Sequence, residues 1–258
     1  MENILKYLLF ILNKPNIKKY FGWVINLIIL NYAVVLFIKK EHDSFHNAYF
    51  HAKKQSQHPQ VGERTIEYLW VLKRIGDYKG KRILDVGSKV GLPITDIMIE
   101  ENQVVGLDPN IGFDDKHENL SLIKGDIRKT NFGDNYFDCV VIVSTLEHVG
   151  IAGRYGITEM DDCGDFKAMK EIYRILKNEG TVIGTVPFGT GRSLPLNRLY
   201  NIQRLREVFS DFDVLEITFF RFYEKYNLWR EVEEAVAFEN NWDQDPWYSL
   251  ACFYLKKH

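Results

Sequence analysis

Cysteine is scarce in this sequence, and neither sign of charge is in large excess. The three cysteines, Cys139, Cys163 and Cys252, are far apart and odd in number, which excludes a disulfide framework and the closely paired ligands of structural zinc. The 33 lysines and arginines are balanced by 35 aspartates and glutamates, so the formal net charge of −2 argues against a general nucleic-acid binder. With 258 residues, the chain is long enough to bury a hydrophobic core without disulfide or metal staples.

Charge is also absent from one long stretch near the N-terminus. Residues Tyr20–Ile38 include no charged side chain, and 16 of these 19 residues are apolar. A helix of this length would measure about 28 Å, close to the hydrocarbon thickness of a bilayer. Lysines flank the stretch on both sides, as expected of side chains that reach toward lipid headgroups. We predict a membrane-associating segment within residues 1–40; the alternative is a helix buried against the rest of the protein.

A polar segment separates this stretch from the remainder of the chain. Near the end of that segment Ile66, Leu69 and Trp70 recur at helical spacing and predict a helix. We therefore divide the chain into the hydrophobic segment 1–40, a polar linker with a helix over 41–79, and a larger domain over 80–258.

From residue 80 onward, short apolar runs alternate with helix-like segments. The runs predict strands at residues 82–87, 103–107, 120–124, 137–143 and 181–186, with helices at 92–101 and 166–176. Such alternation is typical of a parallel sheet with helices on both faces. Two later runs, 214–220 and 247–255, predict a C-terminal antiparallel hairpin. The expected fold is α/β: a Rossmann-like, doubly wound, mostly parallel sheet that follows the N-terminal hydrophobic helical segment.

Glycines and carboxylates follow the first three predicted strands, at the edge where parallel sheets bind ligands. Gly87 and Gly91 flank the loop after the first strand, where a glycine lets the backbone approach a ligand closely. Asp108 ends the second strand and can accept hydrogen bonds from both hydroxyls of a ribose. Asp126 ends the third strand, within reach of the amino group of an adenine. These residues predict a ligand that contains adenosine, and the loop GSKVG lacks the G-x-G-x-x-G pattern of a dinucleotide site.

Longer strings carry a family resemblance. They are DVGSKVG, ERTIEYLWVL, FDCVVIVSTLEHVG with GRYG after it, GDFKAMKEIYRILKNEGTVIGTVPFG, and the late tryptophan-rich stretch. Over about residues 80–256 the chain resembles the class I S-adenosylmethionine-dependent methyltransferases, and most closely a type-11-like branch associated with cell-surface glycan and polysaccharide synthesis. The resemblance implies S-adenosyl-L-methionine as cofactor. The cofactor-binding residues it implies are Asp85, Gly87, Ser88, Gly91, Asp108, Asp126, Ile127 and Ser144.

One position departs from the family that the chain resembles. Lys89 stands where the loop of that family usually has a glycine. Its side chain either points outward or lies at the cofactor, where it either binds the cofactor carboxylate or crowds the cofactor. If it crowds the cofactor, the domain would be a catalytically silent, membrane-tethered scaffold.

Methyl transfer to a hydroxyl requires an in-line nucleophile and a group that receives its proton. We predict His148 as the general base and Glu147 as a residue that orients His148 or contacts the substrate. The alternatives are a packed structural histidine and a glutamate that caps a helix. The segments 150–165 and 188–200 predict loops over the site. The predicted substrate contacts are Arg154, Tyr155, Arg192, Arg198 and Tyr200.

The resemblance and the predicted membrane segment favour the same class of acceptor. We predict methyl transfer to a hydroxyl of a saccharide or lipid-linked saccharide, by an enzyme that is membrane-associated and has its catalytic domain in the cytoplasm. The alternative acceptor is an isoprenoid quinone or another membrane lipid. The string STLEH lacks the Asp/Asn-Pro-Pro-aromatic signature of methyltransferases that act on DNA bases, so we expect no nucleic-acid partner. No metal is expected, and the sequence does not specify an oligomeric state.

Overall fold

The computed structural model describes residues 63–76, 78–87, 93–111, 117–153, 159–190, 197–223, 228–241 and 247–258. The predicted membrane segment Tyr20–Ile38 lies outside the described residues, as does most of the predicted linker. No helix among the described residues is both long and apolar enough to cross a bilayer. The chain falls into two compact units, and the larger one, Trp70–Phe222 with Trp229–His258, contains every contact discussed below.

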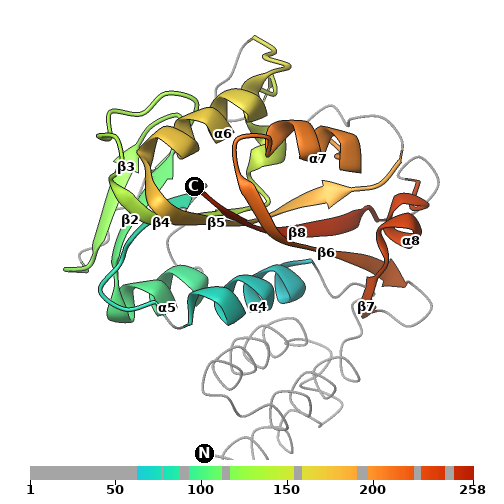
Figure 1. Ribbon diagram of the computed structural model, residues 1–258, viewed down its shortest axis with the longest axis horizontal. Coiled ribbons are helices and arrows are strands. Elements are labelled where there is room, and N and C mark those ends of the chain that lie inside the picture. Colours follow the sequence, from blue (N-terminus) through green and yellow to red (C-terminus); the bar gives the residue numbers. More distant parts are fainter. Residues whose placement is uncertain are drawn as a thin grey trace, which may run out of the picture. The chain divides into compact units, whose positions relative to one another are not determined.

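In the described part of the chain, eight strands form one sheet in the order β3-β2-β1-β4-β5-β8-β6-β7 (Figure 1). The strands are β1 Arg82–Val86, β2 Gln103–Asp108, β3 Leu120–Lys124, β4 Phe137–Val143, β5 Leu176–Phe188, β6 Asp213–Tyr223, β7 Leu228–Val232 and β8 Ser249–Lys256. Strands β1 to β5 are parallel to one another, and β8 is antiparallel to both β5 and β6. The predicted mostly parallel, Rossmann-like sheet is therefore confirmed.

The C-terminal antiparallel pair forms as predicted from β6 and β8, but these strands are not joined by a simple hairpin turn. Strand β7 and the short helix α8, Glu234–Phe238, lie between them along the chain. Strand β5 also begins at Leu176, earlier than the predicted Thr181, and a register irregularity in β4 between Phe137 and Cys139 accompanies this early start. The residues after Leu176 are polar, which explains why the apolar pattern missed them.

Helices cover both faces of the sheet. Helix α6, Gly164–Ile175, and helix α7, Ile202–Val208, lie on one face, and helix α5, Pro93–Glu101, lies on the other with the second half of helix α4, Arg64–Ile75 (Figure 1). Helix α6 buries the stripe Ala168, Met169, Ile172 and Ile175, whose spacing follows one face of a helix. Asn201 caps α7 by accepting a hydrogen bond from the amide of Arg204.

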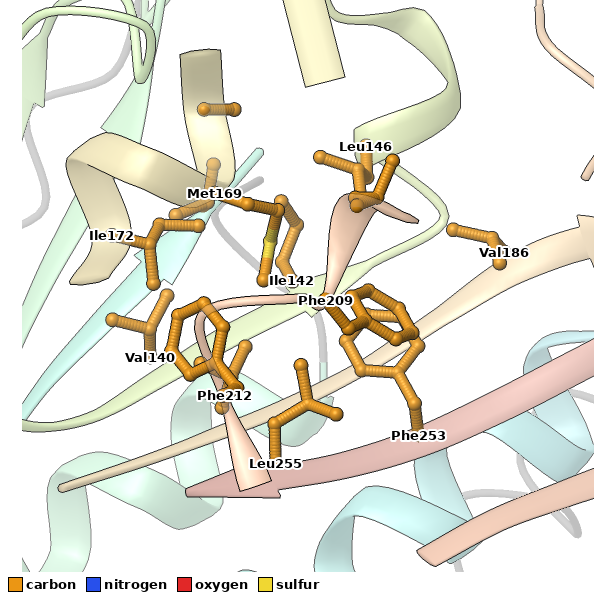
Figure 2. Close-up of a cluster of buried hydrophobic side chains, with 14 of the residues drawn as sticks. Val140, Ile142, Leu146, Met169, Ile172, Val186, Phe209, Phe212, Phe253 and Leu255 are labelled. Atoms are coloured by element: carbon orange, nitrogen blue, oxygen red, sulfur yellow. The ribbon is translucent and has the colours of Figure 1, made fainter. Parts of the chain in front are cut away.

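The main hydrophobic core lies between the sheet and helices α6 and α7. Met169 and Ile172 of α6 pack over Val140 and Ile142 of β4, and Phe209 and Phe212 follow α7 into the same cluster (Figure 2). Strand β8 contributes Phe253 and Leu255 from the antiparallel part of the sheet. Because each such side chain stabilises the fold by about 1.5–3 kcal/mol when buried, this core fixes the sheet on which the site is built.

The strand order reverses direction between β1 and β4. From β1 the chain proceeds outward through β2 and β3, and it then returns to place β4 on the other side of β1. In open parallel sheets, ligands bind outside the carboxyl ends of the strands at such a switch point. The segments that follow β1 and β4 therefore define where the site should be.

Candidate active site

Gly87 and Thr145 meet at the switch point. Gly87 follows β1 with a φ of +78°, and its amide donates to the carbonyl oxygen of Leu107 at 2.8 Å. A Cβ atom on Gly87 would lie 2.2 Å from Oγ1 of Thr145, which follows β4. Thr145 is held there because Oγ1 donates to the carbonyl of Val143 at 2.9 Å. Both the backbone angle and the lack of space require a glycine at position 87.

Asp85 fixes the beginning of the same loop. Its carboxylate is buried at 6% exposure in β1, and Thr95 of α5 donates to Oδ2 at 3.1 Å. The carboxylate thus links the strand to the helix on the two sides of the loop. Ser88, Lys89 and Gly91 lie outside the described residues, so the roles predicted for them stay predictions.

Asp108 presents one carboxylate oxygen at the end of β2. Its Oδ1 accepts a hydrogen bond from the amide of Asn110 at 2.7 Å, which fixes the side chain in a tight turn. Its Oδ2 accepts no hydrogen bond from the residues that the structure describes. An oriented carboxylate with one oxygen available is the acceptor that a ribose hydroxyl requires.

Asp126 has an intramolecular partner that the sequence analysis missed. Arg128 donates from Nε and NH2 to Oδ2 at 3.0 and 2.7 Å, and its backbone amide donates to Oδ1 at 2.9 Å. Burial raises the pKa of Asp126, but the hydrogen bonds from Arg128 outweigh this effect and lower the pKa below its ordinary value. An adenine amino group would share this carboxylate with Arg128. The side chain of Ile127 is buried in the main core.

Arg128 also connects the third strand to the segment before α6. Its NH1 donates to Oδ2 of Asp161 at 2.9 Å, and Lys167 of α6 donates to the same carboxylate at 3.0 Å. The D-x-R spacing of Asp126 and Arg128 is the local signal that could have indicated this pair.

Ser144 ends β4 in a strained conformation. It has a φ of +42°, which is uncommon for a residue other than glycine, and it is 9% exposed. Its amide donates to the carbonyl oxygen and to Oγ1 of Thr185 at 3.2 and 3.1 Å. Strain of this kind, about 1–3 kcal/mol, is often found at functional sites. Here it turns the chain into the 3₁₀ helix η1, Leu146–His148.

Glu147 and His148 lie side by side on η1. The distance from Nε2 of His148 to Oε1 of Glu147 is 3.6 Å, and the two side chains are 11% and 2% exposed. The carboxylate of Glu147 is thus close enough to act on the imidazole of His148. The pair can therefore orient a histidine and stabilise its charge after it accepts a proton, which is the arrangement expected of a general base.

Arg198 and Tyr200, predicted to contact substrate, instead have internal partners. The hydroxyl of fully buried Tyr200 donates to Asp165 at 3.0 Å. Arg198 is 4% exposed and donates to the carbonyl oxygens of Val149 and Asp161. Both side chains are thus held by internal partners, and a contact with substrate stays a prediction. Their sequence context suggested an exposed loop, whereas their partners come from distant segments that the local pattern does not reveal.

Asp165 is the centre of this buried polar network. Arg204 donates to both oxygens of Asp165 at 2.9 Å, in the bidentate geometry that strengthens an arginine–carboxylate pair. Burial, followed by the charges of Asp165 and Glu147, raises the pKa of Tyr200 well above its ordinary value, so this hydroxyl stays protonated. The network lies beneath η1, because the amide of Arg198 donates to the carbonyl of Glu147 at 2.9 Å. Arg154, Tyr155 and Arg192 lie outside the described residues.

Comparison with protein families agrees with this geometry. Residues 84–184, from β1 into β5, match the family model described as a methyltransferase domain. This part of the chain is similar to a methyltransferase domain. The cofactor of this enzyme class is S-adenosylmethionine, and the residues of the methyltransferase domain fit it: Gly87 permits close approach of the backbone, and Oδ2 of Asp108 is placed to accept from a ribose hydroxyl. The match supports the predictions of an S-adenosylmethionine-dependent methyltransferase and of this cofactor, and the activity of the whole protein is a proposal.

Curated relatives match part of the chain. The chain is 30% identical over 139 residues to the ubiquinone/menaquinone biosynthesis C-methyltransferase UbiE of Haemophilus ducreyi, and the match covers 49% of this chain and 48% of that protein. The chain is 31% identical over 120 residues to the sterol 24-C-methyltransferase erg-4 of Neurospora crassa, and the match covers 42% of this chain and 28% of that protein. The chain spans about half the length, or less, of these curated relatives.

Solved structures share the fold at low sequence identity. Phosphoethanolamine N-methyltransferase 2 of Haemonchus contortus, with S-adenosylhomocysteine bound, has a TM-score of 0.52 at 19% identity, and the match covers 74% of this chain and 53% of that one. The [4+2]-cyclase SpnF has a TM-score of 0.51 at 17% identity, and the match covers 72% and 78%. Because a cyclase shares the fold, the fold alone does not specify the reaction or the acceptor.

Proposed function

We propose that this enzyme transfers a methyl group from S-adenosylmethionine to a hydroxyl of a saccharide or lipid-linked saccharide. The match to a methyltransferase domain supports the reaction class. The observation that carries the proposal is the Glu147–His148 pair, because a base is what a neutral hydroxyl needs and an already nucleophilic amine does not.

The residues of the site divide into two functional groups. Asp85, Gly87 and Asp108 lie at the ends of the first two strands and would hold the cofactor, which when bound would supply an electrophilic methyl group on a sulfonium. His148 would accept the proton of the acceptor hydroxyl as the hydroxyl oxygen gains the methyl group and the methyl–sulfur bond of the sulfonium breaks. Glu147 stabilises the resulting imidazolium. General-base assistance of this kind contributes a factor of about 10²–10⁴ in rate.

An isoprenoid quinone or another membrane lipid is the second candidate acceptor. The names of two curated relatives, a ubiquinone/menaquinone C-methyltransferase and a sterol C-methyltransferase, favour it. The same base would then remove the proton of a ring hydroxyl, which makes the adjacent ring carbon nucleophilic. The two candidates differ in the product: a methyl ether on a saccharide, or a new carbon–carbon bond on a lipid ring.

We further propose that residues 20–38 associate the enzyme with a membrane and that the catalytic domain faces the cytoplasm. The length of this segment, its lack of charge and its flanking lysines support the proposal. Fractionation of cells that express the full chain tests it. The protein should sediment with membranes and resist extraction by salt, and recovery in the soluble fraction would contradict the proposal.

Two variants of the full-length protein test the assigned roles. Asp108→Ala should weaken S-adenosylhomocysteine binding in calorimetric titration by about 10- to 100-fold, because a hydrogen bond to a charged group is lost. His148→Ala should keep that affinity and lose turnover. Unchanged cofactor affinity in Asp108→Ala would remove the ribose assignment, and full turnover in His148→Ala would remove the base.

A further inference from the structure

Asp161, which lies shortly before α6, has contacts with four different parts of the chain. Its amide donates to the carbonyl oxygen of Gly150 at 2.8 Å, and its carbonyl oxygen accepts from NH2 of Arg198 at 2.6 Å. Its carboxylate accepts from NH1 of Arg128 at 2.9 Å and from Nζ of Lys167 at 3.0 Å. The amide, the carbonyl and the carboxylate of this one residue are thus all used, each toward a different part of the chain.

On one side these contacts reach η1, which carries Glu147 and His148. Gly150 follows His148 by two residues, and a Cβ atom on Gly150 would lie 2.5 Å from the carbonyl oxygen of Asp161. The two backbones therefore touch, with no room for a side chain between them. Arg198 adds a second connection, because its amide donates to the carbonyl oxygen of Glu147 at 2.9 Å and its guanidinium donates to that of Asp161. The end of η1 is thus fixed to Asp161.

On the other side the contacts reach the end of β3. Arg128 donates from Nε and NH2 to the carboxylate of Asp126 and from NH1 to that of Asp161. One planar guanidinium thus spans two carboxylates, a geometry that the single ammonium of a lysine does not reproduce. Hydrogen bonds from Lys167 and, against the effect of burial, from Arg128 hold the pKa of Asp161 below its ordinary value. Its carboxylate is therefore ionised near neutral pH when it binds Arg128.

The two cations at the carboxylate of Asp161 differ in their exposure to solvent. The side chains of Arg128 and Asp161 are 23% and 19% exposed, whereas that of Lys167 is 57% exposed. Solvent screens an exposed ion pair strongly, so such a pair contributes little to the position of its members. Arg128 is therefore the partner through which the side chain of Asp161 acts, and Lys167 offers a matched comparison at the same carboxylate.

We propose that Asp161 is a positioning residue for the methyl transfer. Through Arg128 and through its own backbone it holds η1, and with it His148, in a fixed place relative to Asp126 at the end of β3. This inference rests on the proposed function, because His148 is the base of that function and Asp126 is the predicted contact of the adenine. In-line transfer tolerates little displacement, since a misplacement of about 1 Å can cost a factor of about 100 in rate.

The imidazole signal of His148 in NMR spectra reports the position of η1 without any ligand. The sequence has seven histidines, and the variant His148→Ala identifies the signal. Asp161→Asn removes the charge that Arg128 binds and leaves the pair of Arg128 with Asp126 intact. In the full chain we expect the His148 signal to shift in Asp161→Asn and in Arg128→Met, and to stay in place in the control Lys167→Met. A His148 signal that is the same in the parent protein and in both test variants, or an equal shift in the control, would overturn the proposal.

The double variant Arg128→Met, Asp161→Asn distinguishes one shared connection from two unrelated effects. Both single variants break the same ion pair, so the shift of the His148 signal in the double variant should be clearly smaller than the sum of the two single shifts. Shifts that add would show that the two residues act independently and would contradict the proposal. If one of the single variants does not fold, the comparison of the other with Lys167→Met decides.

Two further measurements keep this inference apart from the proposed function. In Asp161→Asn, turnover of S-adenosylmethionine with a lipid-linked saccharide fraction should fall by about 10- to 100-fold, while the calorimetric affinity for S-adenosylhomocysteine changes by less than about threefold. Full turnover in Asp161→Asn would remove the positioning role and leave the methyltransferase. A parent protein that binds no S-adenosylhomocysteine would remove the proposed function, and the His148 signal would still decide whether Asp161 holds η1 in place.

Discussion

Replacing Gly87 by alanine should destabilise the protein through two separable effects. The φ of +78° costs a residue with a Cβ about 1–2 kcal/mol. The added Cβ would also lie 2.2 Å from Oγ1 of Thr145, and overpacking of this kind costs about 1–3 kcal/mol. We therefore expect Gly87→Ala to lower the free energy of unfolding by about 2–5 kcal/mol in urea denaturation.

Two other glycines separate these effects. Gly80 has a φ of +64° and open space around it, so Gly80→Ala should show the backbone cost of about 1–2 kcal/mol alone. Gly133 has neither a positive φ nor a close neighbour, and Gly133→Ala should change the free energy of unfolding by less than about 0.5 kcal/mol.

A second substitution at Thr145 tests the contact itself. In the double variant Gly87→Ala, Thr145→Ala, the closest atom to the new Cβ is the Cβ of residue 145 at 3.0 Å instead of Oγ1 at 2.2 Å. The decrease in the free energy of unfolding of the double variant should therefore be smaller, by at least about 1 kcal/mol, than the sum of the decreases in the two single variants. If Gly87→Ala were at least as stable as Gly80→Ala, the packing of the Gly87 loop against the Thr145 loop at the switch point would be refuted.

Three further predictions concern the buried polar network, the hydroxyl of Ser249 and the response to pH. Tyr200→Phe removes one of the hydrogen bonds to buried Asp165 and should lower the free energy of unfolding by about 1–3 kcal/mol. If urea denaturation shows no change, Arg204 alone satisfies the carboxylate. Ser249→Ala removes an unpaired buried hydroxyl, so the free energy of unfolding should be unchanged or raised by up to about 1 kcal/mol, and a clear loss of stability would indicate a hidden structural partner. Hydrogen bonds from Arg174, opposed by burial, hold the pKa of Glu171 at about 2, below its ordinary value of 4.5. The ionised carboxylate therefore stabilises the folded protein fully at pH values above 4.5, and this stabilisation is lost as the pH falls toward 2. Urea midpoints for Glu171→Gln should accordingly fall less steeply than those of the parent protein on acidification, and parallel curves would show that Glu171 has no such role.

The parallel half of the sheet was predictable because its strands are continuous apolar runs. Strands β1 and β4 are buried on both faces, as RILDV and FDCVVIV suggest, and the α6 stripe follows a helical repeat. Strand β7, with the sequence LWREV, has two adjacent charged residues and no apolar alternation, so its pattern does not indicate a strand and it was missed. The predicted division of the chain at residues 40 and 79 stays a prediction.

The candidate site was predictable where it depends on strand ends and obscure where it depends on distant partners. Four predicted site residues lie at the carboxyl ends of apolar runs: Asp85, Asp108, Glu147 and His148. Because these runs form parallel strands, the topology brings the four residues to one edge of the sheet. Arg198 is buried because carbonyl oxygens from residues 149 and 161 receive its guanidinium, and no local pattern shows this. Buried arginines are rare without such pairing, so sequence reasoning assigned it to the surface.

The central claim, methyl transfer to a saccharide hydroxyl, is tested most directly by the position of the transferred methyl group. The full chain is incubated with S-adenosylmethionine labelled with ¹³C in its methyl group, a lipid-linked saccharide fraction and a demethylated quinol, and the products are separated and analysed by NMR and mass spectrometry. We predict a labelled methyl ether on the saccharide that is absent when His148→Ala replaces the parent protein. Label on a ring carbon of the quinol, or no transfer to either acceptor, would contradict the claim.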